Sequence, residues 1–288
     1  MDPYLFSYAA AADPPVKRNL IRLVERATGQ PRLKRLYLEN QRNPRAGESF
    51  FAAAVRKLDL DVRFEAAALA RIPRTGPVVV VANHPYGVLD GIVLSWLVEQ
   101  VRRDFVVLTH AALRRAPEVR DFALPIDFAG DEAATETNLK TRIAARAQLE
   151  RGGVVIVFPA GAVSTAPARL GPRPAVDSRW QPFVAQLIQR AGACVVPVWF
   201  SGQNSRLFQI ASHVSQTLRL SLIFHEVEAR IGASLPVVVG PPVPYSALAQ
   251  IKGRQELADR LREMSYALAV PDGARRMRPR RKAMPRAA

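Results

Sequence analysis

Short runs of β-branched residues recur through the middle of the chain and constrain its fold more than any other feature. The central run, VVVVAN, has four consecutive valines where a half-exposed strand would alternate apolar and polar residues, so we expect a strand that is buried on both faces. Similar runs are DFVVLTH, GVVIVFPAG, ACVVPVWFSG and LPVVVGPPVP, and DVRFEA alternates as a strand does. Helical patterns separate several of these runs. They include a short helix at APEVRDFA and a helix from Trp180 to Ala191, with Asp177 or Ser178 as its expected N-cap. This alternation predicts an α/β fold with a mixed, mainly parallel central sheet flanked by helices.

The regions on either side of the strands differ from them in composition. Residues 1–60 contain basic helical patterns such as VKRNLIRLVERATG and predict a helical N-terminal platform. This platform either caps the sheet or lies on a membrane surface, since basic residues flank its apolar faces. Residues 61–270 hold the strands. Residues 271–288 include ARRMRPRRKAMPRAA, which is rich in Arg and poor in apolar residues, and predict a basic, disordered tail.

The chain carries a large positive charge. A formal net charge of +16 favours an anionic partner: nucleic acid, an anionic membrane or an acidic carrier protein. Nucleic acid is disfavoured, because no RRM, helix-turn-helix or zinc-finger pattern occurs and aromatic residues make up only 7%. The single cysteine, Cys194, excludes an intrachain disulfide and fits a reducing compartment. We find no signal peptide and no run of about 20 apolar residues, so we expect any membrane contact to be peripheral.

Three of the expected strands end in residues that are able to do chemistry. The first ends in Asn83-His84-Pro85, with Asp90 six positions after His84. A neutral imidazole takes a proton from a hydroxyl when a carboxylate holds its other nitrogen in the right tautomer. The alternative is a structural histidine at a strand end and an aspartate that complements a helix dipole. The four histidines form no HxH or HExxH pattern, so we predict no metal site.

The motifs at the three strand ends resemble those of a known family. NHPYGVLDG, FPAGAVS and VVPVWFSGQNSRLF, in this order, resemble the glycerolipid acyltransferase superfamily, the family of 1-acylglycerol-3-phosphate acyltransferases. The resemblance is strongest to a bacterial branch labelled hemolysin-like or ornithine-lipid acyltransferase, and it covers roughly Phe50 to Leu268. It implies that residues 61–270 form an acyltransferase domain with a role in lipid metabolism, in phospholipid or ornithine-lipid biosynthesis.

The resemblance also implies a mechanism. His84 would be the general base that deprotonates the hydroxyl of a lysolipid, and Asp90 would orient His84 and compensate its charge. The hydroxyl oxygen would attack the thioester of an acyl carrier protein or of coenzyme A, with no bound cofactor. Backbone N–H groups near Gly161 would stabilise the oxyanion. The substrate-binding residues that the resemblance implies are Asn83, Gly87, Phe158, Pro159, Gly161 and Ser164.

Two departures from the commoner family pattern affect the expected acceptor. Five residues rather than four separate His84 from Asp90, so the loop must bulge, and Gly87 makes this possible. The arginines that bind phosphate in the family are missing, since their places read Ile126-Asp127-Phe128 and Gly161-Ala162-Val163-Ser164-Thr165. Lyso-ornithine lipid is therefore an expected acceptor beside lysophosphatidic acid. Arg169, Arg173 and Arg206 are candidate substitutes for the missing arginines.

The charge and the resemblance together imply a peripheral enzyme on the cytoplasmic face of a membrane. The expected partners are a lysolipid acceptor, an acyl carrier protein or CoA thioester, and an anionic membrane surface that attracts the basic tail. The rival is a non-catalytic lipid-binding or membrane-perturbing protein, which the hemolysin-like label suggests. The His–Asp pair disfavours this rival, because a protein that only binds lipid needs neither residue.

Overall fold

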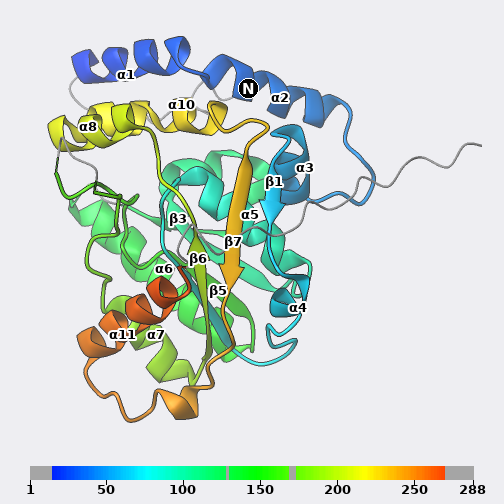
Figure 1. The fold of residues 1–288 in the computed structure, drawn as a ribbon, viewed down its shortest axis with the longest axis vertical. Coiled ribbons are helices and arrows are strands. Elements are labelled where there is room, and N and C mark those ends of the chain that lie inside the picture. Colours follow the sequence, from blue (N-terminus) through cyan, green and yellow to red (C-terminus); the bar gives the residue numbers. More distant parts are fainter. Residues whose placement is uncertain (1–14, 128–129, 169–172, 270–288) are drawn as a thin grey trace, which may run out of the picture.

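The computed structural model describes residues 15–127, 130–168 and 173–269, so the basic tail and residues 1–14 lie outside the described part. Within these residues a seven-stranded sheet, ordered β1-β7-β6-β2-β5-β3-β4, forms the centre of the molecule, and helices pack around it (Figure 1). The strands are β1 (Asp61–Arg63), β2 (Val78–Ala82), β3 (Phe105–His110), β4 (Ala123–Ile126), β5 (Val154–Val157), β6 (Cys194–Phe200) and β7 (Ser234–Val239). The α-helices are α1 (Pro15–Ala27), α2 (Gln30–Arg42), α3 (Phe50–Lys57), α4 (Ala66–Leu69), α5 (Val88–Glu99), α6 (Glu132–Glu150), α7 (Phe183–Ala191), α8 (Arg206–Val214), α9 (Gln216–Ser221), α10 (Ile223–Glu228) and α11 (Arg254–Ala267).

The strand directions confirm the predicted mixed, mainly parallel sheet. Every pair of neighbouring strands is parallel except β6 and β7. Strand β2 lies between β5 and β6, and Val81 pairs with Val157 on one side and with Pro197 on the other. Because these three strands run in the same direction, the residues that follow them meet at one edge of the sheet.

Strand β2 is buried on both faces, as its run of valines predicts. Val78, Val80 and Ala82 pack into a core shared with α3, α5 and the α8–α10 segment. Val79 and Val81 point to the opposite face and pack with α6, α7 and α11. All five residues of the strand are fully buried. This two-sided packing holds the end of β2, and the residues that follow it, in a rigid position.

A layer of helices covers the end of the sheet toward which β6 runs. Helices α1 and α2 come from the N-terminal region, and α8, α9 and α10 come from the connection between β6 and β7; α1 contacts α9, and α2 contacts α10. Figure 1 shows these two groups together at one end of the molecule, with β7 running away from them. Leu33 of α2 belongs to the same core as β2. No helix among the described residues has the length and apolar character needed to cross a bilayer.

The structure differs from the predicted elements in three places. Strand β4 was not predicted, and APEVRDFA, which we expected to be helical, forms only a 3-10 turn at Pro117–Val119 before β4 begins. Pro125 lies within β4, which it can do because β4 is an edge strand. The helix expected from Trp180 begins at Phe183, after Pro182. The helices α8, α9 and α10 were not predicted, because each is short and most of its stability comes from tertiary packing.

Candidate active site

The site forms where β2, β5 and β6 end side by side. His84 follows β2, Phe158 follows β5, and Phe200 closes β6. The amide of Asn83 joins β2 to β6: its Nδ2 donates to the Phe200 carbonyl at 2.9 Å, and its Oδ1 accepts from the Phe200 N–H at 2.7 Å. The Asn83 side chain therefore extends the pairing of the two strands and holds His84 at the edge of the sheet.

His84 and Asp90 are in contact across the loop that separates them. His84 Nδ1 lies 3.0 Å from Asp90 Oδ2, and Asp90 is completely buried in the first turn of α5. The same oxygen accepts the backbone N–H groups of Tyr86 at 2.8 Å and Gly87 at 3.0 Å. Gly87 has φ +76°, which a residue with a side chain rarely adopts. The extra loop residue is thus accommodated by a tight turn that folds around the carboxylate.

The Asp90 carboxyl lies in an environment that opposes its ionisation. Burial raises its pKa above the ordinary value, and the hydrogen bonds and charge from His84, Tyr86 and Gly87 oppose that rise. Its second oxygen, Oδ1, has no hydrogen-bond partner among the described residues. An imidazolium formed at His84 during a reaction would compensate the charge of this buried carboxylate.

The His84 ring is held by stacking and remains accessible. It stacks on the Phe158 ring with 4.2 Å between the ring centroids. The side chain keeps 19% of its exposure. Because Nδ1 faces Asp90, Nε2 is the nitrogen that is left to take a proton from a bound hydroxyl.

A residue that the sequence analysis did not place in the site supports the backbone of His84. The buried Asp177 carboxylate accepts the His84 backbone N–H at 3.1 Å, the Ser164 hydroxyl at 2.5 Å and Trp180 Nε1–H at 2.8 Å. We expected Asp177 or Ser178 to cap the following helix, but this carboxylate faces the site instead. The only local feature that pointed to it was an aspartate three residues before a tryptophan. The His84 contact spans 93 residues, so no local pattern predicts it.

The remaining predicted substrate-binding residues have structural contacts. Ser164 N–H donates to the His84 carbonyl at 2.8 Å, so Ser164 supports His84 through its amide as well as through Asp177. The N–H of Gly161 donates to the Phe158 carbonyl at 3.0 Å. This N–H is therefore already paired in this conformation, and the oxyanion role of the N–H groups near Gly161 stays a prediction. Pro159 accepts the Gln181 N–H at 2.9 Å.

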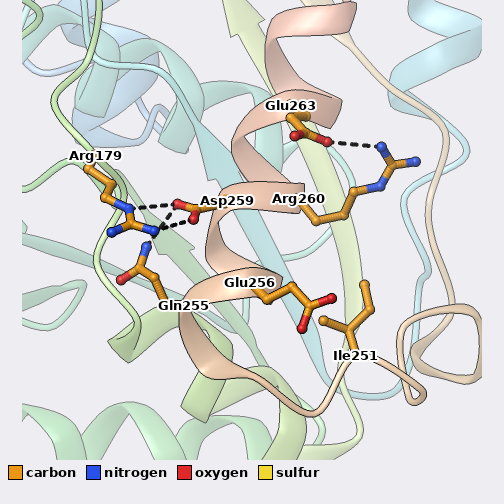
Figure 2. Close-up of a pocket in the computed structure, with 7 residues that line it drawn as sticks. All are labelled: Arg179, Ile251, Gln255, Glu256, Asp259, Arg260 and Glu263. Carbon is orange, nitrogen blue, oxygen red and sulfur yellow. Dashed lines mark hydrogen bonds and ion pairs between the residues drawn. The ribbon is translucent and has the colours of Figure 1, made fainter.

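A surface hollow elsewhere on the molecule does not suit an acyl chain. It lies along α11 and is shown in Figure 2. Ile251 is the one apolar residue of its lining, and the walls carry the exposed ion pairs Arg179–Asp259 at 2.6 Å and Arg260–Glu263 at 3.1 Å. An acyl-chain site needs an apolar wall, so we assign no part of the reaction to this hollow. No cluster of His, Cys, Asp or Glu that could hold a metal ion occurs in the described ranges.

Comparison with known proteins identifies the family. Residues 63–201 match the family model described as Acyltransferase. This match and the two relatives described below support the resemblance to the glycerolipid acyltransferase superfamily. The protein is an enzyme that transfers acyl groups. His84, Asp90, Phe158 and Asp177 all lie in the matched segment, whereas α8 to α11 follow it.

Two curated relatives of this acyltransferase carry the same name, lyso-glycine lipid O-acyltransferase. The protein from Bacteroides thetaiotaomicron is 25% identical over 237 residues, which cover 80% of this chain and 83% of the relative. The protein from Phocaeicola vulgatus is 23% identical over 241 residues, with 81% and 82% covered. Among solved structures, the 1-acyl-sn-glycerophosphate (LPA) acyltransferase PlsC from Thermotoga maritima aligns at a TM-score of 0.49 and 17% identity, covering 82% of this chain and 78% of its own.

Proposed function

We propose that this acyltransferase moves a fatty acyl group from a thioester to the hydroxyl of a lysolipid. The observation that carries the proposal is the contact of 3.0 Å between His84 Nδ1 and the buried Asp90 carboxylate, within a segment that matches the acyltransferase family. A base oriented by a carboxylate at an accessible sheet edge suits deprotonation of a substrate hydroxyl. The sequence contains no GxSxG motif, and no serine or cysteine stands between His84 and Asp90. A covalent enzyme intermediate on such a nucleophile is therefore not part of the proposal.

In the proposed mechanism His84 acts on the acceptor. Nε2 takes the hydroxyl proton as the oxygen attacks the thioester carbonyl, and Asp90 stabilises the imidazolium that forms. The tetrahedral intermediate then collapses, the C–S bond breaks, and the imidazolium returns its proton to the departing thiolate. The products are a diacyl lipid and the free thiol of acyl carrier protein or coenzyme A. Asp177 and Phe158 hold His84 while it does this, through its backbone N–H and its ring.

The acceptor that we propose is a lysolipid with an amino-acid head group. Two relatives are named for lyso-glycine lipid, and the arginines that bind phosphate in the family have no counterpart at the corresponding places in this sequence. Of the candidate substitutes, Arg173 and Arg206 are exposed, and Arg169 lies outside the described residues. Lyso-ornithine lipid and lysophosphatidic acid are the alternatives that an acceptor assay must include.

An acceptor assay tests the proposal. Purified protein is incubated with labelled acyl carrier protein thioester, or with labelled acyl-CoA, and is offered lyso-glycine lipid, lyso-ornithine lipid and lysophosphatidic acid separately. We expect label in a diacyl product with at least one amino-acid lysolipid, and a slower reaction with lysophosphatidic acid. Transfer to none of the three by folded protein would contradict the proposal and favour a non-catalytic lipid-binding protein.

We further propose that the enzyme works at the cytoplasmic face of a membrane. Exposed large apolar residues gather on two helices of the covering layer: Val16, Leu20 and Leu23 on α1, and Leu207, Ile210 and Val214 on α8. Each set recurs at helical spacing, so each lies on one face of its helix. Both helices contact α9, at the end of the molecule toward which β6 runs (Figure 1). A bilayer that covered these residues would lie at the end of the sheet that carries the site.

Replacing Leu23 or Leu207 by Gln should weaken binding to anionic vesicles by roughly tenfold each, because burying one leucine in an apolar phase is worth about 1.5–3 kcal/mol. The measurement is sedimentation with vesicles. Leu139→Gln is the matched control, since Leu139 is as exposed as these residues but lies on α6. If all three variants bind like the wild type, or lose binding equally, the α1 and α8 faces are not the docking surface.

A further inference from the structure

Two arginines of the helical layer contact the loops that carry the site. Arg219, in α9, donates to the Val163 carbonyl, and Val163 immediately precedes Ser164, whose N–H binds the His84 carbonyl. Arg230, just after α10, lies over the Tyr86 ring with its guanidinium carbon 4.0 Å from the ring centroid. Tyr86 belongs to the turn around Asp90. The two guanidinium groups therefore reach the His84–Asp90 loop and its neighbour from the layer above.

These arginines lack acidic partners of the kind that Arg56 and Arg102 have. Arg56 pairs with Glu48 at 2.6 Å, and Arg102 pairs with Asp104 at 2.5 Å. No carboxylate lies within ion-pair distance of Arg219 or Arg230 in residues 15–127, 130–168 and 173–269. Arg230 donates to the Gln203 carbonyl, while its Nε is buried with no acceptor among the same residues. Burying a charged donor without an acceptor destabilises a fold, so this arrangement favours an anion that arrives with a ligand.

The environment of Arg219 also favours an anionic ligand. Its guanidinium lies 5.7 Å from the centroid of the Phe208 ring, and burial lowers its pKa below the ordinary value. A guanidinium has five N–H donors in a planar fork, and the carbonyl contact and the ring leave donors to spare. That fork matches a carboxylate or a phosphate through two parallel hydrogen bonds.

We propose that Arg219 and Arg230 form an anion-binding site beside the His84–Asp90 loop that recognises the anionic head group of the lysolipid acceptor, a carboxylate or a phosphate. The inference rests on the proposed function. Such a site would replace the phosphate-binding arginines that this sequence lacks. Its two arginines come from the part of the chain that follows the matched segment. A head group held there would lie beside the two loops that carry and support His84.

The competing explanation is that both arginines only brace the loops. Bracing explains the carbonyl and ring contacts, and its loss would lower stability and activity with every acceptor alike. An anion site makes a different prediction, because it distinguishes acceptors by the charge of the head group. The experiment therefore measures discrimination between head groups rather than activity alone.

The test is equilibrium binding without an acyl donor, so it does not depend on catalysis. The full chain is titrated with lysolipids that share one acyl chain and carry a glycine, a glycinamide or a phosphate head group, dispersed in phosphatidylcholine vesicles. We expect the wild type to bind the glycine or the phosphate form at least tenfold more tightly than the amide, the effect of one charge-assisted pair. Arg219→Gln and Arg230→Gln should each reduce that ratio several-fold. Comparing the glycine and phosphate forms shows which anion the site accepts.

Two further variants keep the result interpretable. Arg219→Lys retains the positive charge but not the planar guanidinium, so it should keep part of the preference for anionic head groups. It provides the measurement if Arg219→Gln is too unstable to purify. Arg146→Gln removes an exposed charge of α6 that pairs with Glu150 and should leave the ratio as in the wild type. A wild type that binds amide and carboxylate equally, or Gln variants that keep the preference, would overturn the anion site.

The same panel separates the two proposals. Adding acyl donor to the glycine, glycinamide and phosphate forms measures transfer beside binding. A head-group preference in binding without transfer to any lysolipid would refute the proposed function and leave the anion site standing. Transfer without any head-group preference would refute the anion site and support the function.

Discussion

Replacing His84 by Ala should lower kcat for acyl transfer by about 10²–10⁴-fold, the range that a general base contributes. The fold should survive, because the groups that hold this position are the His84 backbone N–H and carbonyl, bound to Asp177 and Ser164, and alanine keeps both. The ring itself is partly exposed, and it contacts the Phe158 ring and the Asp90 carboxylate. The measurement is kcat with the best acceptor of the assay, together with thermal unfolding of both proteins.

The matched control for this variant is His213→Ala. His213 lies in α8, and its Nε2 contacts the Ala166 carbonyl at 2.8 Å, so its removal costs a contact of similar size away from Asp90. We expect this control to keep most of the activity. Retention of more than a tenth of wild-type activity by His84→Ala would show that another group is the base, whatever the control does.

Replacing Asp90 by Asn should have opposite effects on activity and on stability. Activity should fall by about 10²-fold or more, because the amide cannot hold the imidazole tautomer or stabilise the imidazolium. The free energy of unfolding should rise at neutral pH, because the buried carboxylate is costly and an amide oxygen can still accept the N–H groups of Tyr86 and Gly87.

The pH dependence of that stability difference follows from the raised pKa of Asp90. A carboxyl whose pKa is raised on folding stabilises the folded state while it is protonated, below its unfolded pKa of about 3.9. This contribution disappears as the pH rises through the folded-state pKa. The melting temperature of Asp90→Asn should therefore be close to that of the wild type at acid pH and exceed it increasingly toward neutral pH.

Asp259 is the control for the sign of this effect. It is an exposed carboxyl whose pKa is lowered by Arg179 and Gln255, so Asp259→Asn should lose a small amount of stability as the pH rises rather than gain it. A constant difference between Asp90→Asn and the wild type at all pH values would mean that burial does not oppose ionisation of Asp90. A variant that is less stable at neutral pH would show that the His84 contact outweighs burial.

Local sequence predicted much of the sheet and the proximity of His84 and Asp90, because both depend on near neighbours. The run VVVVA predicts a strand that is buried on both faces, and it forms β2, in which every residue is buried. His84 and Asp90 are six residues apart with Gly87 between them, so a single tight turn decides whether they meet. Strand β4 escaped prediction because four residues with a proline have little pattern of their own.

The roles of the residues around that pair were decided by tertiary structure. Asn83 and Ser164 were expected to line a substrate pocket, yet their polar groups bind Phe200, Asp177 and the His84 carbonyl. Each of the contacts made by these two side chains, like that of Asp177 with His84, joins segments that are more than ten residues apart. Those of Asn83 join the end of β2 to β6. A sequence shows which groups can donate or accept, but only the packing of the chain shows which of them are already satisfied.

The sequence by itself thus determined the fold class, the acyltransferase motifs and the His84–Asp90 spacing, since these depend on periodicity and on one short loop. Only the tertiary structure brought Arg230 to that loop and Arg219 to the neighbouring loop at Val163, because both contacts join parts of the chain that are far apart in sequence. Their positions depend on how the connection after β6 folds back with α1 and α2 over the edge of the sheet. That arrangement results from burial of many weak helical faces together, and no single segment specifies it.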